Sequence, residues 1–123
     1  MNEEEKQILL IDLSARYPYR VMIHSIWDYQ ELSGKIKRKE TDRTMESHDF
    51  CDYWNCKPYL RPISSMTEKE RQEYLAECDK DNEDSITTPR YHGIEWLNKK
   101  MFDYRGLIEK NLALDCTGLH IYD

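Results

Sequence analysis

Aliphatic residues crowd the start of the chain, where five of the six residues from Ile8 to Leu13 are isoleucine or leucine. This density predicts a largely buried helix over residues 3–15. Glutamates at positions 3–5 suit the positive end of that helix dipole. Pro18 disfavours the α conformation for Tyr17, so the helix is expected to end there.

Two strands are expected next. Residues 20–27 alternate with apolar side chains on both faces, a pattern typical of a central strand. Residues 28–30 would turn the chain. In residues 31–38, Leu32 and Ile36 share one face and lysines occupy the other, which predicts a half-exposed partner strand.

The middle of the chain is less regular. Residues 40–57 show no clear period, although they contain three aromatic residues. Two prolines frame the segment from Lys57 to Pro62. Proline removes a backbone donor, so this segment is expected to be extended and to form a short edge strand.

Helix-start signals dominate the second half. The sequence from Thr67 to Glu70 is a capping box, which predicts a helix over residues 67–78. Its inward residues would be Met66, Tyr74, Leu75 and Cys78.

A polar loop is expected over residues 79–85, and Thr88-Pro89 predicts the start of a second helix. That helix would carry Ile94, Trp96, Leu97 and Met101. Asp103 would cap a further short helix through Leu112, and residues 119–122 alternate like a closing strand.

Together these elements predict a single α+β domain over residues 1–123, a small antiparallel sheet with three to four helices packed on one face. The chain has 123 residues, with four glycines and four prolines, which excludes collagen-like chains. No window holds the roughly 20 apolar residues of a membrane span. The acidic N-terminal residues are unlike a secretory signal, so we expect a cytoplasmic protein with reduced cysteines and no membrane partner.

The net charge of −6 is unevenly distributed. Residues 68–84 hold eight acids and three bases, −5, whereas residues 35–43 hold five bases and two acids, +3. Separated patches of opposite sign can orient a partner, although both can also be merely solvated faces. The candidate acidic surface comprises Glu70, Glu73, Glu77, Asp79, Asp81, Glu83 and Asp84, and the candidate basic strand comprises Lys35, Lys37, Arg38 and Lys39.

Tyrosine and arginine recur together in segments bounded by proline or turn residues. Both residue types are enriched at binding hot spots, although such tyrosines can equally pack on the sheet. The candidate hot spots are Tyr59, Arg61, Tyr104 and Arg105.

No cofactor or metal is expected. His48, Cys51 and Cys56, with Cys78 as a fourth ligand, offer zinc-binding atoms at spacings that structural zinc sites do not favour. Residues 79–84 imitate a calcium loop but lack its glycine and its final glutamate.

Catalytic motifs are equally weak. Cys116 and His120 are the only near thiol–imidazole pair that we consider for nucleophilic catalysis, and no local signature supports them. We assign no catalytic residue and expect that the protein is not an enzyme.

Three stretches carry a family resemblance: ILLIDLSARYPYRV from Ile8, KPYLRPISSMTEKERQEY from Lys57 and FDYRGLIEKNLALD from Phe102. They resemble small uncharacterised proteins encoded by gut Bacteroidales and by their phages and mobile elements. The resemblance implies a single compact domain in a mobile-element context. It implies no activity and no catalytic residue.

The leading hypothesis is therefore a non-enzymatic accessory protein of a phage or mobile element. It would bind a host or phage protein through its charge-separated surface, for example to inhibit or modulate a defence protein, and a homodimer is a further expected assembly. The alternative is a nucleic-acid-binding accessory module that uses the basic strand and the nearby Trp27 and Tyr29. The third hypothesis is a small metal-binding protein or enzyme.

Overall fold

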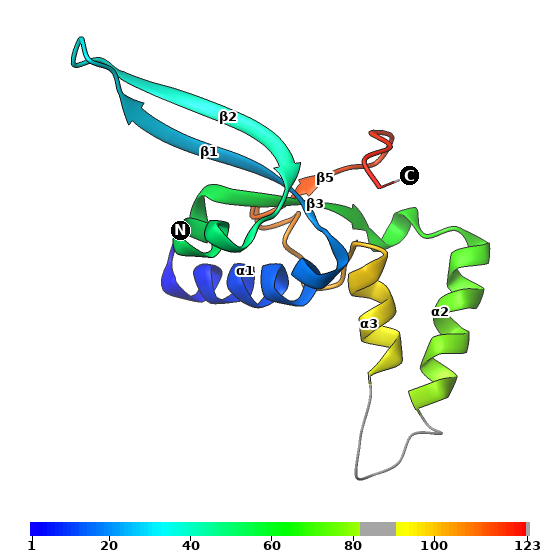
Figure 1. Cartoon of the computed structure of the whole chain (residues 1–123). Helices are drawn as coiled ribbons and strands as arrows, with labels where there is room; N and C mark the ends of the chain where they lie inside the picture. The colour runs from blue at the N-terminus through cyan, green and yellow to red at the C-terminus, as the bar shows by residue number, and fades with distance from the viewer. Residues whose placement is uncertain (82–90, 123) are drawn as a thin grey trace.

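Helix α1 (Glu3–Arg16) opens the chain in the computed structural model, which describes residues 1–81 and 91–122 (Figure 1). The Asn2 side chain accepts a hydrogen bond from the backbone N–H of Glu5, which fixes the start of the helix. Contrary to expectation, α1 is buried on one face only, and Ile11 is 56% exposed. The sheet and its neighbours cover a single side of the helix. The number of aliphatic residues in the helix therefore predicted more burial than the structure has.

The helix ends at residue 16, but Tyr17 does not leave the helical region as expected. Tyr17 keeps right-handed helical angles and begins a short 3-10 turn, η1 (Tyr17–Tyr19). The chain reverses at Arg20, whose φ is 63°.

The strands of the sheet are β1 (Met22–Gln30), β2 (Ile36–Thr44), β3 (Cys56–Pro62), β4 (Phe102–Asp103) and β5 (Leu114–Asp115). Their order in the sheet is β2-β1-β3-β4, with β5 also paired to β3. Its antiparallel pairs join β1 to β2 and to β3, whereas β3 pairs in parallel with β4 and β5. The α+β class is therefore confirmed, but the sheet is mixed rather than purely antiparallel.

Strand β1 is central, as predicted, because it lies between β2 and β3. The predicted position of the second strand, residues 31–38, was wrong. Strand β2 begins at Ile36 and includes residues 40–44, for which no regular structure was expected. The expected apolar face is also wrong, since Leu32 is fully exposed and Ile36 is 74% exposed. Strand β2 has no buried face over most of its length, so its sequence shows no apolar period.

Strand β3 is not the edge strand that its prolines indicated. Pro58 stands opposite Ile23 at the last position paired with β1, and Pro62 is the last residue paired with β4. Each proline therefore lies where a ladder stops, and the missing N–H interrupts no continuing pairing.

The segment between β2 and β3 forms η2 (Ser47–Asn55), which packs against the core through Phe50 and Tyr53. Its buried Asp49 accepts hydrogen bonds from both terminal nitrogens of Arg43 at 2.6 and 2.5 Å. The 3-10 turn η3 (Ile63–Ser65) follows β3.

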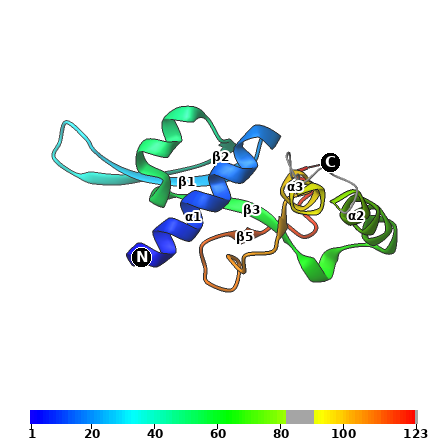
Figure 2. The same cartoon turned by 90° about the horizontal axis from the view of Figure 1, so that it is seen from below.

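Helices α2 (Glu68–Asp81) and α3 (His92–Lys99) pack side by side at the other end of the molecule (Figures 1 and 2). The capping box is confirmed, because the Glu70 N–H donates to the Thr67 hydroxyl and the Thr67 N–H donates to the Glu70 carboxylate. A Cβ on Gly93 would stand 2.8 Å from the Cys78 sulfur, so the close approach of the helices requires glycine there.

Several details of this helical pair differ from expectation. Leu75 is 46% exposed rather than inward, and Ile94 of α3 is also 46% exposed, because each helix has a packing partner on only part of its surface. Residues 79–81 continue α2 rather than forming a loop. Thr88-Pro89 lies outside the described residues.

The last segment is built from turns. Asp103 acts as the expected cap, since its carboxylate accepts the N–H groups of Leu107 and Ile108, but no helix follows. Residues 119–122 form turns rather than a strand. The Tyr122 hydroxyl instead donates to the Tyr59 carbonyl at 2.7 Å, which ties the end of the chain to β3.

The core lies between α1, the sheet and the final turns. Helix α1 lies below the sheet in Figure 1, whereas α2 packs against α3 at the end of the sheet. Two charged residues, Asp12 and Arg16, are fully buried beside the core. The core residues are Leu9, Leu13, Val21, Ile23, Met45, Cys56, Leu60, Met101, Leu107, Leu112 and Ala113.

Candidate interaction surface

The β1–β2 hairpin projects from the body of the molecule as a two-stranded ribbon (Figures 1 and 2). Strand β3 pairs with β1 only from Ile23 to Ser25, whereas β1 and β2 pair along their whole length. We call residues 26–40 the arm. Among the described residues, only the two strands of the hairpin pair with each other along the arm.

One face of the arm combines aromatic and basic side chains. Trp27 stands opposite Lys39, and Tyr29 opposite Lys37. Directly opposed residues of an antiparallel pair point to the same face. The centres of the Trp27 and Tyr29 rings lie 5.7 Å apart, and the Lys39 ammonium lies 5.5 Å from the centre of the Trp27 ring. Lys37 and Lys39 of the basic strand therefore share one face with Trp27 and Tyr29, whereas Arg38, opposite Asp28, lies on the other face.

The arm also exposes large apolar side chains. Trp27 and Tyr29 are each 40% exposed, Ile36 is 74% exposed, and Leu32 at the tip is fully exposed. A two-stranded ribbon has no core of its own, so it cannot bury these side chains. Trp27 and Tyr29 lie on one face of the ribbon and Ile36 on the other, and exposed apolar side chains gathered on one projecting element are typical of an interaction site.

Cross-strand ion pairs reduce the positive charge of the arm. Lys37 lies 2.9 Å from Glu31, and Arg38 lies 3.3 Å from Asp28. The arm has four bases and three acids in all, a net charge of +1. Lys35 lies in the turn between the strands.

The base of the arm is fixed by a hydrogen-bonded network. Asp42 on β2 accepts a hydrogen bond from the Tyr59 hydroxyl at 2.7 Å and lies 2.7 Å from Nδ1 of His24 on β1. Burial, together with the Asp42 carboxylate, raises the pKa of Tyr59 to about 12. Tyr59, a candidate hot spot, is thus a buried anchor between β3 and β2.

The other three candidate hot spots also have internal partners. Arg61 stacks 4.2 Å from the centre of the Phe102 ring and is paired with Glu70. The Tyr104 hydroxyl donates to the Asn98 side chain at 2.9 Å, and Arg105 donates to Asp12 at 2.6 Å. These side chains connect elements of the fold.

The acidic surface follows α2, at the opposite end of the molecule from the arm (Figures 1 and 2). Asp81 accepts the N–H groups of His92 and Gly93 at the start of α3, and Glu77 pairs with Lys80. Glu73 is half-buried and Asp79 is exposed. Glu83 and Asp84 lie outside the described residues.

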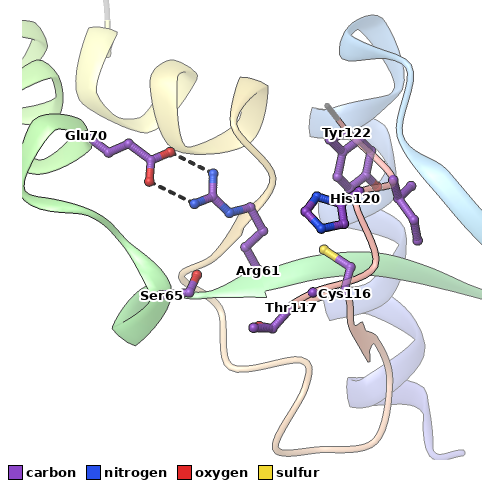
Figure 3. Close-up of a pocket in the computed structure, with 9 residues that line it drawn as sticks. Arg61, Ser65, Glu70, Cys116, Thr117, His120 and Tyr122 are labelled. Atoms are coloured by element: carbon purple, nitrogen blue, oxygen red, sulfur yellow. Dashed lines mark hydrogen bonds and ion pairs between the residues drawn. The ribbon is translucent and has the colours of Figure 1, made fainter.

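A pocket of about 380 Å³ adjoins the Arg61–Glu70 pair (Figure 3). Cys116 and His120, the thiol–imidazole pair considered from the sequence, both line it, and the thiol points toward the imidazole. Burial raises the pKa of Cys116 above its usual value. Because the thiolate is the nucleophile, this environment does not activate the sulfur.

The Arg61–Glu70 pair gives a pH-dependent prediction. Hydrogen bonds from Arg61 lower the pKa of Glu70 from 4.5 to about 2. A lowered carboxyl pKa stabilises the fold above the unfolded pKa, and this stability is lost as the pH falls through the folded value. Glu70→Gln keeps a helix-capping amide. The difference in thermal midpoint between wild type and Glu70→Gln is therefore expected to shrink between pH 4.5 and pH 2; a constant difference would contradict this assignment.

Other candidate sites receive less support. Within residues 1–81 and 91–122, no group of three or more histidine, cysteine or acidic residues is placed to hold a metal ion. Cys51 is exposed while Cys56 is buried. None of the described helices is long and apolar enough to cross a membrane.

A second apolar surface lies beside α2. This groove, of about 500 Å³, includes Ile63, Leu75 and Tyr104 among its lining residues. It competes with the arm as an interaction surface, and Leu75 provides a position from which to test it.

Sequence reasoning identified the basic strand but missed the arm, because it assigned Leu32 and Ile36 to a buried face. The sequence feature that indicates an exposed strand is the run from Lys37 to Arg43, in which six of seven residues are charged. A strand of that composition cannot bury either face. Comparisons of the chain with protein-family models, curated proteins and solved structures find no match.

Proposed function

We propose that this chain is a non-enzymatic protein-binding module whose main contact surface is the arm. The observation that supports it is the exposure of Trp27, Tyr29, Leu32 and Ile36 on a ribbon that cannot bury them. Binding to a partner would remove this apolar surface from water. Tryptophan and tyrosine are also the residue types that contribute most at interfaces.

A protein partner fits the arm better than nucleic acid. Phosphate contacts supply most of the affinity for nucleic acid, yet two of the four bases of the arm are paired with acids and the whole chain carries −6. The aromatic and lysine side chains on one face favour nucleic acid as the alternative, since bases stack on aromatic rings.

The proposal extends to the role that the family resemblance implies. The partner is then a host or phage protein, and the chain acts as an accessory factor of a phage or mobile element. The acidic surface on α2 lies far from the arm and would orient the complex rather than anchor it.

Site-specific photo-cross-linking tests this proposal. A benzophenone side chain at position 29 lies on the arm, and the same group at position 75 lies at the apolar groove. We expect one discrete protein adduct in the native host from position 29 and none from position 75. Leu32→Asp combined with Ile36→Asp should abolish the adduct, because it places charge on the apolar surface of the arm.

The opposite pattern would contradict the proposal. An adduct formed only from position 75 would move the interface to the groove beside α2. An adduct from position 29 to a second copy of this chain would identify the arm as a homodimer contact.

A further inference from the structure

One edge of the arm has backbone groups that no described strand pairs. The Glu31 N–H donates to the Lys35 carbonyl, and the Met45 N–H donates to the Val21 carbonyl. Opposed residues in an antiparallel pair alternate between bonded and non-bonded positions. The odd-numbered residues of β1 therefore bond to β2, and the backbone groups of Ile26 and Asp28 face the other edge.

This open edge of β1 is the same edge with which β3 pairs closer to the body of the molecule. His24, another even-numbered residue, stands opposite Lys57 of β3, and the pairing stops after Ser25 and Cys56. Upstream of Cys56 the chain turns away into η2. Asn55 is next in register opposite Ile26, so an extended segment could pair with β1 from Asp28 onward, beyond the point where β3 ends.

A hollow of about 440 Å³ lies at this edge. Two partly exposed tryptophans border it, Trp27 from β1 and Trp54 from η2. Ile26 contributes to its wall, so the hollow can receive a large apolar side chain. The remaining lining residues are Asp28, Arg38, Asn55 and Lys57.

The surroundings of the hollow are positively charged. Arg38 and Lys57 line it, and the Lys39 ammonium lies over the Trp27 ring. The Lys6 ammonium, which is paired with Glu3 at 3.7 Å, lies 5.6 Å from the centre of the Trp54 ring. Asp28 is the single acid among the lining residues, and it is paired with Arg38. This balance favours a ligand with negative charge.

The outer edge of β2 is a poorer docking edge. Charged side chains occupy six of the seven positions from Lys37 to Arg43. Natural sheets use such charges to prevent pairing at an edge. Strand addition is therefore expected at β1 and not at β2.

We propose that the open edge of β1 binds an extended acidic segment of the partner as an added strand, with one large apolar side chain in the hollow between Trp27 and Trp54. This inference rests on the proposed function, because it names the partner segment that the arm binds. Backbone hydrogen bonds would supply the affinity, and the hollow and the surrounding lysines would supply the specificity.

Two proline variants separate the edges of the arm. Asp28→Pro removes an N–H that faces the open edge of β1, whereas Arg38→Pro removes one that faces the outer edge of β2. Both variants abolish the same Asp28–Arg38 ion pair and leave the hydrogen bonds between β1 and β2 intact. Proline is tolerated in an edge strand when its nitrogen faces solvent.

The probe is a labelled eight-residue peptide in which glutamate alternates with valine around one tryptophan. Fluorescence anisotropy on the full chain is expected to show binding that Asp28→Pro weakens at least tenfold and Arg38→Pro changes less than twofold. Amide exchange provides the structural readout. Exchange at Asp28 should slow at least tenfold with peptide, while exchange at Trp27 and Tyr29, already bonded to β2, should change little.

Several results would overturn the inference. These are equal binding of the peptide to both proline variants, equal binding of a lysine-for-glutamate peptide, and no binding up to millimolar peptide. If an eight-nucleotide oligothymidine binds more tightly than the peptide, the ligand of this edge is single-stranded nucleic acid and not an added peptide strand. Amide spectra of each variant establish that its core is folded.

The outcomes also separate this inference from the proposed function. If the cross-link from position 29 persists while both proline variants bind the peptide alike, the arm remains the interface and strand addition fails. If position 29 gives no cross-link, the proposed function itself fails.

Discussion

Replacing Asp12 by alanine is expected to destabilise the protein by about 3–5 kcal/mol, the usual cost of removing one partner of a buried ion pair. The Asp12 carboxylate lies 2.9 Å from Nε of Arg16 and accepts a hydrogen bond from Arg105 at 2.6 Å. Asp12 and Arg16 are both fully buried. Without the carboxylate, a guanidinium charge would remain in the interior with little compensation.

The same cluster connects distant parts of the chain. Arg16 on α1 donates to the Phe102 carbonyl on β4 at 2.6 Å, and Arg105 reaches Asp12 from the turn after β4. One terminal nitrogen of Arg16 is buried without a hydrogen-bond partner, so the guanidinium depends strongly on Asp12. The cluster therefore helps to hold the rigid body from which the arm projects.

Urea denaturation measures this effect, and Asp28→Ala is the matched control. Asp28 and Arg38 also form an ion pair, but both side chains are more than half exposed. An exposed pair contributes about 1 kcal/mol or less. Similar losses for Asp12→Ala and Asp28→Ala would contradict the role assigned to the buried cluster.

The sequence predicted the elements that depend on local signals. The capping box at Thr67 and Glu70 works through side chains three residues apart, so its outcome does not depend on the rest of the fold. The central strand β1 was predicted because both of its faces carry apolar residues near the body of the molecule. Asp103 was identified as a cap for the same local reason, although no helix follows it.

Long-range pairing could not be read from the sequence. The prolines of β3 indicated an edge strand, but they lie where two different ladders end. The burial of Asp12 and Arg16 depends on Phe102 and Arg105, which are about 90 positions away in the chain. Neither residue shows a local pattern that distinguishes it from a surface charge.

The sequence predicted which residues belong to the candidate site, but not how the hairpin arranges them. The lysines of residues 35–39 were identified, and so were the nearby Trp27 and Tyr29. Their register across the hairpin, and the ion pairs that neutralise part of their charge, depend on where the turn falls. The turn was expected at residues 28–30, but it follows Gln30. This shift of a few residues turns the predicted half-buried second strand into part of an exposed arm.

The central claim is that the arm carries partner binding while the body folds without it. Replacing residues 26–40 by Asn-Gly removes the arm and joins Ser25 to Thr41, an opposed pair of odd-numbered residues in the bonded register. A two-residue turn of this kind closes a hairpin. The core residues Val21 and Ile23 remain in place, so this shortened chain is expected to fold.

The most direct measurement is the affinity of the shortened chain for the partner cross-linked at position 29, compared with that of the full chain. Loss of at least about 100-fold is expected, because Trp27 and Tyr29 are the types of residue that dominate interface energies. Leu75→Ala, on the rival groove, should bind as tightly as wild type. A folded shortened chain that binds the partner within a few-fold of wild type would contradict the account.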